Sequence, residues 1–201
     1  MDLKIFFIVL IVIIILTNKK IYVPLLCLVH IKKLLIKYKN SIKFNKEEAY
    51  KILHDVTPIL EKYNIFFWLS EGTALGVYRD NDLIDHDDDV DISFRSEYLK
   101  TFKDKVIPEL KKLGYTIGKL ASLYYIMNDH IILDVDVLFE NSSCGAKYWQ
   151  PVKELEPHIK DFYIKEFRGH KYNIPKESYY EYLYGKDYMI PLKKKPQFSL
   201  F

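Results

Sequence analysis

One feature constrains this chain more than any other, a run of four aspartates at alternate positions. They are Asp85, Asp87, Asp89 and Asp91. Read as a β-strand, this spacing puts the four carboxylates on one face, about 6.5–7 Å from one to the next. So many like charges destabilise a fold unless a positive charge lies among them. A hard divalent ion is the simplest such charge, and an ion bound by carboxylates commonly holds phosphates as well. The spacing therefore predicts a site for Mg²⁺ or Mn²⁺.

Two simpler explanations of the run fit the sequence less well. A calcium-binding EF-hand loop needs Gly at its sixth and Glu at its twelfth position. When the loop is counted from Asp87, Ile92 and Tyr98 stand there. A solvated acidic surface would not lead directly into the apolar–polar alternation of the residues that follow. A further pair, Asp134 and Asp136, lies in a strongly apolar segment, where a carboxylate needs a partner.

The N-terminal residues 1–31 are strongly apolar. Residues 5–16 form an unbroken apolar run, which as a helix would span about 18 Å of the roughly 30 Å hydrocarbon core. A cleaved signal peptide would need a small-residue cleavage site that the chain lacks. A buried core helix is not normally apolar on all sides. We therefore predict a short signal anchor, with residues 21–31 as a candidate extension, in a single-pass membrane protein.

The orientation of this anchor stays open. The lysines that follow the apolar run favour a cytoplasmic C-terminal side. The glycosylation sequon Asn141-Ser142-Ser143 instead suits a domain in the lumen of the ER or Golgi.

The charged residues exclude one class of partner and single out one side chain. The formal net charge is +3, which is too small to predict binding to nucleic acid. Arginine is rare, and only Arg79, Arg95 and Arg168 occur. Lysine cannot copy the planar, bidentate fork of arginine. Arg79, inside the acidic stretch, is therefore a candidate functional residue.

Behind the anchor we predict a basic, polar connector over residues 32–43 and one α+β domain over residues 44–201. Asn45 with Glu48 three positions later is an N-cap signature that starts a helix. Apolar residues at period two predict strands, and apolar residues at helical spacing predict helices. The expected strands are residues 65–69, 90–94, 115–117, 123–127 and 131–139, and the expected helical segments are 45–63, 72–78 and 96–113. A last strand, turn and helix are expected over residues 162–184.

Two kinds of enzyme place a D-x-D pair on a strand beside a divalent ion. One is the GT-A-like glycosyltransferase, which uses a sugar nucleotide, and the other is the nucleotidyltransferase-type fold. In the second kind a helix with a Gly-Ser or Gly-Thr turn precedes the D-x-D strand, and a later strand supplies a third aspartate. The chain has Gly72-Thr73, then Asp89 and Asp91, then Asp136. This order matches the second kind, in which backbone N–H groups of the turn can bind phosphate oxygens.

The segment GTALGVYRDNDLIDHDDDVDI, residues 72–92, resembles the signature of the LicD/fukutin family. That signature reads approximately G-T-L-L-G-x-x-R-x-x-x-x-I-P-W-D-x-D-x-D. Similarity extends over about residues 45–191 and includes the C-terminal YYEYLYGKDYMIP. The residues in register without a gap are Gly72, Thr73, Leu75, Gly76, Arg79, Ile84, Asp87, Asp89 and Asp91.

This resemblance implies a nucleotidyltransferase-like mixed sheet flanked by helices. It also implies transfer of a phosphorylated small alcohol, such as phosphocholine or ribitol phosphate, from a CDP-linked donor to a glycan or glycoprotein hydroxyl. Family members are often type II membrane proteins of the Golgi, or act on bacterial cell-surface glycans, which suits an anchor ahead of the domain. The chain departs from the family where Asp85-His86 replaces Pro-Trp and where no proline follows Phe139. We expect its substrate preference to differ there.

The mechanism that we infer gives each acidic residue a role. Asp89 and Asp91 are expected to bind one or two Mg²⁺ or Mn²⁺ ions, with help from Asp87. Asp136 is expected to be the third carboxylate ligand and to take the proton of the acceptor hydroxyl. Asp134 is the alternative, because the strand register is unknown.

Other residues are expected to bind the donor. Gly72, Thr73 and Gly76 would cradle the diphosphate. Arg79 would either pair with phosphate or brace the aspartates, and His86 is either a donor contact or a polar loop residue. Two other functions stay open, a GT-A-like glycosyltransferase and a catalytically inactive, membrane-tethered family member.

Overall fold

The computed structural model describes residues 32–36, 44–120, 122–139 and 152–191. The predicted anchor lies outside these ranges, as does the sequon, so both stay predictions. None of the helices within the described ranges is long and apolar enough to cross a membrane.

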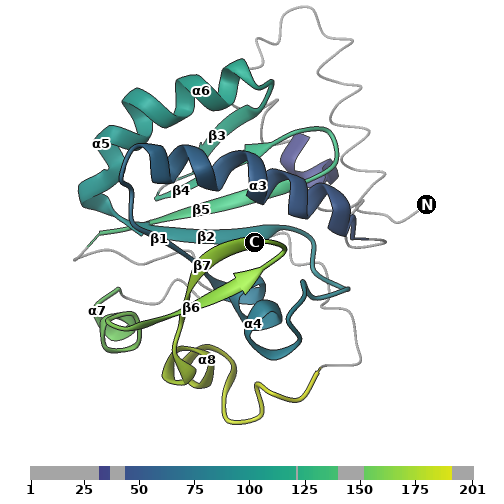
Figure 1. Cartoon of the computed structure of the whole chain (residues 1–201), viewed down its shortest axis with the longest axis vertical. Helices are drawn as coiled ribbons and strands as arrows, with labels where there is room; N and C mark the ends of the chain where they lie inside the picture. The colour runs from purple at the N-terminus through teal and green to yellow at the C-terminus, as the bar shows by residue number, and fades with distance from the viewer. Residues whose placement is uncertain (1–31, 37–43, 121, 140–151, 192–201) are drawn as a thin grey trace, which may run out of the picture.

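A five-stranded mixed sheet forms the centre of the domain (Figure 1). Its strands are β1 (Phe67–Leu69), β2 (Val90–Arg95), β3 (Thr116–Leu120), β4 (Leu123–Met127) and β5 (Ile132–Leu138). Their spatial order is β1-β2-β5-β4-β3. β2 and β5 are parallel, and the other neighbouring pairs are antiparallel. A parallel pair needs a crossover connection, which here consists of the helical segment after β2 and the β3–β4 hairpin.

Helical layers cover both faces of the sheet (Figure 1). One layer holds α3 (Lys46–Lys62), α5 (Leu99–Thr101) and α6 (Ile107–Lys112). The other holds α4 (Glu71–Arg79), α8 (Glu177–Tyr184) and a hairpin of β6 (Phe162–Phe167) and β7 (His170–Pro175). Shorter elements are the 3₁₀ turns η1 (Ser96–Tyr98) and η3 (Glu156–His158), the π-helical turn η2 (Phe102–Val106) and α7 (Val152–Leu155). This architecture confirms the predicted α+β class, a mixed sheet flanked by helices.

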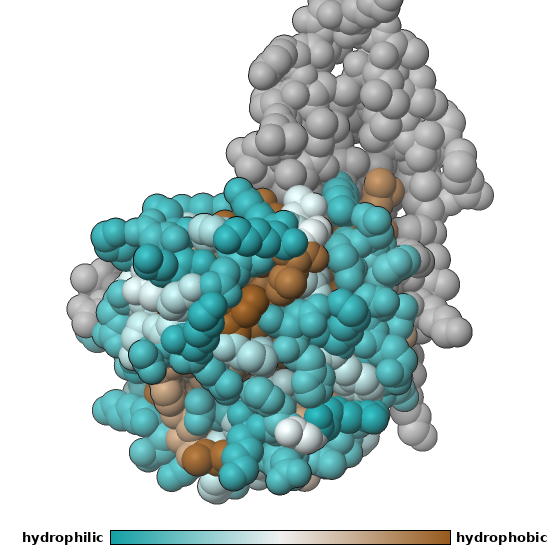
Figure 2. Space-filling view, turned by 45° about the horizontal axis from the view of Figure 1, so that its top comes forward, coloured by the Kyte–Doolittle hydropathy of each residue, from teal (hydrophilic) through white to brown (hydrophobic). Residues whose placement is uncertain are grey.

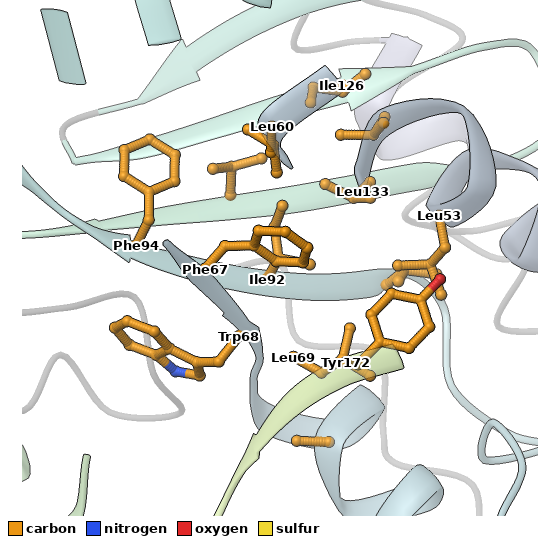
Figure 3. Close-up of a cluster of buried hydrophobic side chains, with 14 of the residues drawn as sticks. Leu53, Leu60, Phe67, Trp68, Leu69, Ile92, Phe94, Ile126, Leu133 and Tyr172 are labelled. Carbon is orange, nitrogen blue, oxygen red and sulfur yellow. The ribbon is translucent and has the colours of Figure 1, made fainter. Parts of the chain in front are cut away.

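One face of β2 and β5 forms the centre of the hydrophobic core (Figure 3). Ile92 of β2 and Leu133 of β5 are fully buried and lie close to Leu60 of α3. Burying one such aliphatic side chain contributes about 1.5–3 kcal/mol. Successive strand residues point to opposite faces, so their neighbours Asp91 and Asp134 point away from α3. The same two strands therefore carry the core on one face and carboxylates on the other.

Most predicted elements are present. Asn45 caps α3, because its Oδ1 accepts a hydrogen bond from the Glu48 N–H at 3.3 Å. Pro58 lies inside α3 and does not divide it. All five strands expected before residue 140 form, with ends shifted by a few residues. The helix expected over residues 96–113 is a succession of short 3₁₀, α and π segments instead.

The prediction that the four aspartates share one strand face is wrong. Only Asp91 lies in β2, whereas Asp85 lies in a turn and Asp89 in a bend before that strand. Lys46 Nζ pairs with Asp85 at 2.6 Å, and the Asp88 N–H donates to Asp87 Oδ1 at 3.1 Å. The second of these is a local bond between a side chain and the backbone, which competes with the ladder of a strand. A loop and a strand together bring these carboxylates to one place.

The C-terminal segment contains one more strand than predicted. β6 and β7 pair in an antiparallel hairpin. Its turn residues, Arg168 and Gly169, have φ values of +51° and +76°. Positive φ at both central residues is typical of a type I′ turn, where Asn-Gly or Asp-Gly is usual. Because Arg168 stands where Asn or Asp is usual, the sequence did not predict this turn.

Hydrophilic residues cover most of the face shown in Figure 2, with small hydrophobic patches between them. Large apolar side chains that are exposed include Phe66, Leu113, Leu120 and Ile164, which lie on different parts of the chain. Scattered exposed apolar residues are normal on a globular domain. We therefore assign them no function.

Candidate active site

The acidic face of β2 and β5 forms the base of the candidate site. In the parallel register, Asp91 lies directly opposite Asp134. Asp89, just before β2, is 6% exposed, and Asp134 is 7% exposed. Carboxylate oxygens from these three residues all lie within 4.8 Å of one another. Hard divalent ions bind oxygen ligands at about 2.0–2.6 Å, so the three residues fit such an ion.

A second group of carboxylates shares Asp89. Asp87, Asp88 and Asp89 each bring a ligand oxygen within 4.8 Å of the others. Asp88 was not among the predicted ligands, although it completes the run of three consecutive aspartates in the sequence. Neighbouring oxygen groups that share a carboxylate suit one or two hard cations.

The strand register favours Asp134 over Asp136 as the third carboxylate. Asp136 lies on the same face of β5 but one register step further, opposite Ser93 of β2 and Leu123 of β4. Strand residues two apart are about 6.5–7 Å from each other. Among the described residues, Asp136 belongs to neither group of ligand oxygens.

Helix α4 meets β2 at Asp91. Thr73 Oγ1 accepts the Asp91 N–H at 2.9 Å and donates to Asp91 Oδ2 at 3.5 Å. The Ser70 N–H donates to the Asp91 carbonyl at 3.1 Å. The hydroxyl of Thr73 therefore orients Asp91, whereas the phosphate contact predicted for this turn is made by backbone N–H groups and stays a prediction. The N-terminal end of α4, which carries a partial positive charge, lies beside the carboxylates as a result.

Gly72 allows the acidic loop to approach α4. A Cβ atom at this position would lie 2.4 Å from Asp87 Oδ2, so a larger residue would displace that carboxylate. The preceding Glu71 has a φ of +46°, which is uncommon for a residue with a side chain. Its N–H donates to the hydroxyl of Tyr179 at 3.0 Å. This arrangement fixes the first turn of α4 against the site.

Gly76 and Arg79 lie further along α4 and contact other parts of the chain. A Cβ atom on Gly76 would lie 2.5 Å from the carbonyl oxygen of Asp82, so this glycine admits the loop after the helix. Arg79 Nη2 pairs with Asp80 at 2.6 Å, and its Nη1 donates to the Tyr188 carbonyl at 3.3 Å. Seven residues of helix place Arg79 about 10 Å along the axis from Gly72. In the described structure Arg79 therefore links the end of α4 to the C-terminal segment. Its predicted contact with phosphate stays a prediction.

His86 lies in the turn beside the carboxylates and is partly buried. Its neighbour Asp85 is exposed and paired with Lys46, which also reaches Asp82 at 3.0 Å. The pair Asp85-His86 stands where the family signature has Pro-Trp. An ion pair, instead of a rigid proline, thus holds this turn against α3.

The electrostatics of the site favour a bound cation. Burial raises the pKa of Asp91 well above its ordinary value, and the neighbouring carboxylates raise it further. A cation among these groups would relieve the repulsion that disfavours the charged form. The neighbours responsible are Asp89, Glu71, Asp87 and Asp134.

Two tyrosines of α8, Tyr179 and Tyr184, lie close to the carboxylates of the site. Tyr179 binds Glu71 as described. Burial raises the pKa of the Tyr184 phenol, and nearby ionisable groups, Asp91 among them, raise it further. Both tyrosines belong to the segment YYEYLYG, whose similarity to the family was the only signal in the sequence.

The comparison with known families decides the assignment. A sequence profile of the LicD/FKTN/FKRP nucleotidyltransferase domain matches residues 64–194. This chain belongs to the LicD/FKTN/FKRP family. The predicted family is therefore confirmed, and the acidic site lies within the matched domain.

Curated relatives support the same family. Ribitol-5-phosphate transferase FKTN from Homo sapiens is 31% identical over 166 residues, which cover 76% of this chain and 35% of that protein. The Macaca fascicularis protein of the same name is 30% identical over 161 residues, or 74% of this chain and 34% of the relative. An uncharacterized protein, RT0683, from Rickettsia typhi is 35% identical over 83 residues, which cover 41% of this chain and 26% of that protein. The chain spans about a third of the length of the FKTN relatives that it matches.

Solved structures are more distant. The solution structure of the antibiotic-resistance factor ANT(2'')-Ia aligns with a TM-score of 0.49 at 13% identity, over 76% of this chain and 79% of that one. A similarity this low carries no argument about function.

Proposed function

We propose that this LicD-type domain is a metal-dependent transferase that moves a phosphorylated small alcohol from a CDP-linked donor to a hydroxyl of a glycan or glycoprotein. The observation that carries the proposal is the convergence of Asp89, Asp91 and Asp134 at the N-terminal end of α4. The FKTN relatives are named ribitol-5-phosphate transferases, which supports ribitol phosphate as the first group to test. Phosphocholine is the second.

Asp89, Asp91 and Asp134 would hold Mg²⁺ or Mn²⁺, with Asp87 and Asp88 beside them. The chemistry that such an ion supplies is neutralisation of the donor diphosphate and of the departing nucleotide. The choice of a hard ion follows from the ligand set, which consists of carboxylate oxygens.

The chain's own groups would bind and orient the donor. The backbone N–H groups in the first turn of α4, at Gly72 and Thr73, are free of partners within the helix and would bind phosphate oxygens. Thr73 also holds Asp91 in place, and Gly72 leaves room for Asp87. His86 stays a candidate donor contact, because its turn borders the carboxylates.

The reaction would be an in-line displacement at the distal phosphorus of the donor. A glycan hydroxyl forms the new P–O bond, the bond to the nucleotide breaks, and CMP leaves. The hydroxyl proton passes to a carboxylate, and Asp134 is better placed for this than Asp136, because it lies within the oxygen group. We also propose that residues 1–31 anchor the protein in the membrane and that it is located in the ER or Golgi.

The test is metal-dependent release of CMP from CDP-ribitol and from CDP-choline. Asp89→Asn should lower the rate by about a hundredfold or more, a loss of the size seen when one electrostatic group of an active site is removed. Asp129→Asn is the matched control, because Asp129 is 82% exposed and pairs with Lys32 at the surface. Release of CMP that survives Asp89→Asn, or turnover of UDP- or GDP-sugars in place of CDP-donors, would contradict the proposal.

A further inference from the structure

A short helix at residues 32–36, purple in Figure 1, precedes the matched family domain. Its residues Lys33 and Ile36 contact the acidic face of the sheet. Ile36 is 5% exposed and shares a small buried cluster with Tyr125, Met127 and Ile132. Tyr125 of β4 lies opposite Asp134. This part of the predicted connector is therefore in contact with the site.

Lys33 lies three residues before Ile36, on the same side of the helical turn. Its Nζ donates to both carboxylate oxygens of Asp134, each at 2.8 Å. The same ammonium lies 4.3 Å from the centre of the Tyr125 ring, a cation–π distance. The side chains of Lys33 and Asp134 are 14% and 10% exposed. A charge-assisted hydrogen bond between two side chains that are so little exposed to solvent is among the stronger polar contacts of a domain.

This pair competes with a metal ion for Asp134. Both oxygens of the carboxylate are engaged by the ammonium, and one of them belongs to the group that fits a divalent ion. An ion bound to the same carboxylate would lie within a few Å of the ammonium, where two positive charges repel each other. The Lys33–Asp134 pair stabilises the metal-free site more than the metal-bound site. By linkage, that difference in free energy lowers the affinity for the ion by the corresponding factor.

We propose that Lys33 is a built-in counter-ion of the site, which neutralises Asp134 in the metal-free protein and lowers its affinity for divalent ions. The inference rests on the metal site of the proposed function. It also implies that residues 32–36 are coupled to metal binding. Lys33 pairs with Asp134 when the site is empty of metal and releases it when a divalent ion binds. A segment outside the family domain would in this way set the ion concentration at which the site fills.

The experiment is a Mn²⁺ titration of the full chain in detergent micelles, with free Mn²⁺ followed by electron paramagnetic resonance. Lys33→Met keeps the length of the side chain and removes its charge. It should lower the Kd for Mn²⁺ about fivefold or more, the range of common coupling effects. It should also lower the Tm in EDTA, because the carboxylates lose a counter-ion. Lys33→Arg, which keeps the charge, should bind Mn²⁺ no more tightly than the wild type.

Lys32→Met is the matched control. Lys32 pairs with the exposed Asp129 at 2.9 Å, so its loss should leave both the Kd and the Tm unchanged. If Lys33→Met does not fold, Lys33→Gln makes the same test. An unchanged or higher Kd for Mn²⁺ in the uncharged variant would overturn the proposed role of Lys33 but not the metal site. A wild-type protein that binds no Mn²⁺ would overturn the metal site itself and this inference with it.

Discussion

The two faces of β2 and β5 have opposite chemistry and opposite effects on stability. On one face Ile92 and Leu133 are fully buried beneath α3, and their burial stabilises the fold. On the other face Asp91 lies beside Asp134, and burial among carboxylates disfavours the charged form of Asp91 in the metal-free fold. The comparison shows how alternation along a single pair of strands supplies both the core and the site. It also predicts that substitutions on the two faces have different consequences.

The largest effect is expected on the apolar face. Ile92→Ala removes buried methyl groups and leaves a cavity, which should cost about 2–5 kcal/mol of unfolding free energy. For a domain of this size that loss corresponds to a decrease in Tm of about 5–15 °C. Thermal unfolding followed by circular dichroism measures it. The rate per folded molecule at low temperature should change little, and a Tm close to the wild-type value would contradict the assignment of this face to the core.

A substitution on the acidic side should affect the reaction more than stability. Gly72→Ala puts a Cβ atom 2.4 Å from Asp87 Oδ2 and should displace that carboxylate. CMP release should decrease about 10–100-fold, as when a group that orients a metal ligand is lost.

Gly76→Ala sharpens this contrast. At that position the Cβ atom meets backbone, the Asp82 carbonyl oxygen, at 2.5 Å. The variant should therefore lose stability, whereas Gly72→Ala should keep a Tm close to that of the wild type. Equal losses of stability in both variants would contradict the claim that Gly72 makes room for a carboxylate of the site whereas Gly76 makes room for backbone.

The smallest effect concerns pH and the metal-free protein. Because the folded-state pKa of Asp91 is raised, its ionisation weakens the fold as pH rises above the pKa of the unfolded chain. The penalty is absent in acid and complete above the folded-state pKa. Asp91→Asn should therefore raise the Tm in EDTA at pH 8 by about 2–4 °C, the shift expected from ~1 kcal/mol. The gain should shrink towards pH 5, and an equal loss of Tm at all pH values would contradict this account.

Local pattern was enough to predict much of the molecule. The apolar–polar alternation after residue 89 predicted β2, and the cap at Asn45 predicted α3. The in-register signature from Gly72 to Asp91 predicted the family. These features depend on neighbours in the chain, so the sequence displays them directly.

Features that depend on distant contacts were not predictable in the same way. The choice between Asp134 and Asp136 depends on the register of two strands separated by a crossover. Arg79 pairs with its own neighbour Asp80, and the sequence offered several acidic partners at similar separation. Lys32 and Lys33 are adjacent in the sequence, yet only Lys33 is bonded to Asp134 in the described structure.

The central claim is that the acidic face of β2 and β5 binds a divalent ion through Asp134. Isothermal titration of Mn²⁺ into the wild type, Asp134→Asn and Asp136→Asn tests it directly. The wild type should bind Mn²⁺, Asp134→Asn should bind it about tenfold more weakly or worse, and Asp136→Asn should stay close to the wild type. Absence of binding in the wild type, or a loss in Asp136→Asn with none in Asp134→Asn, would contradict the account.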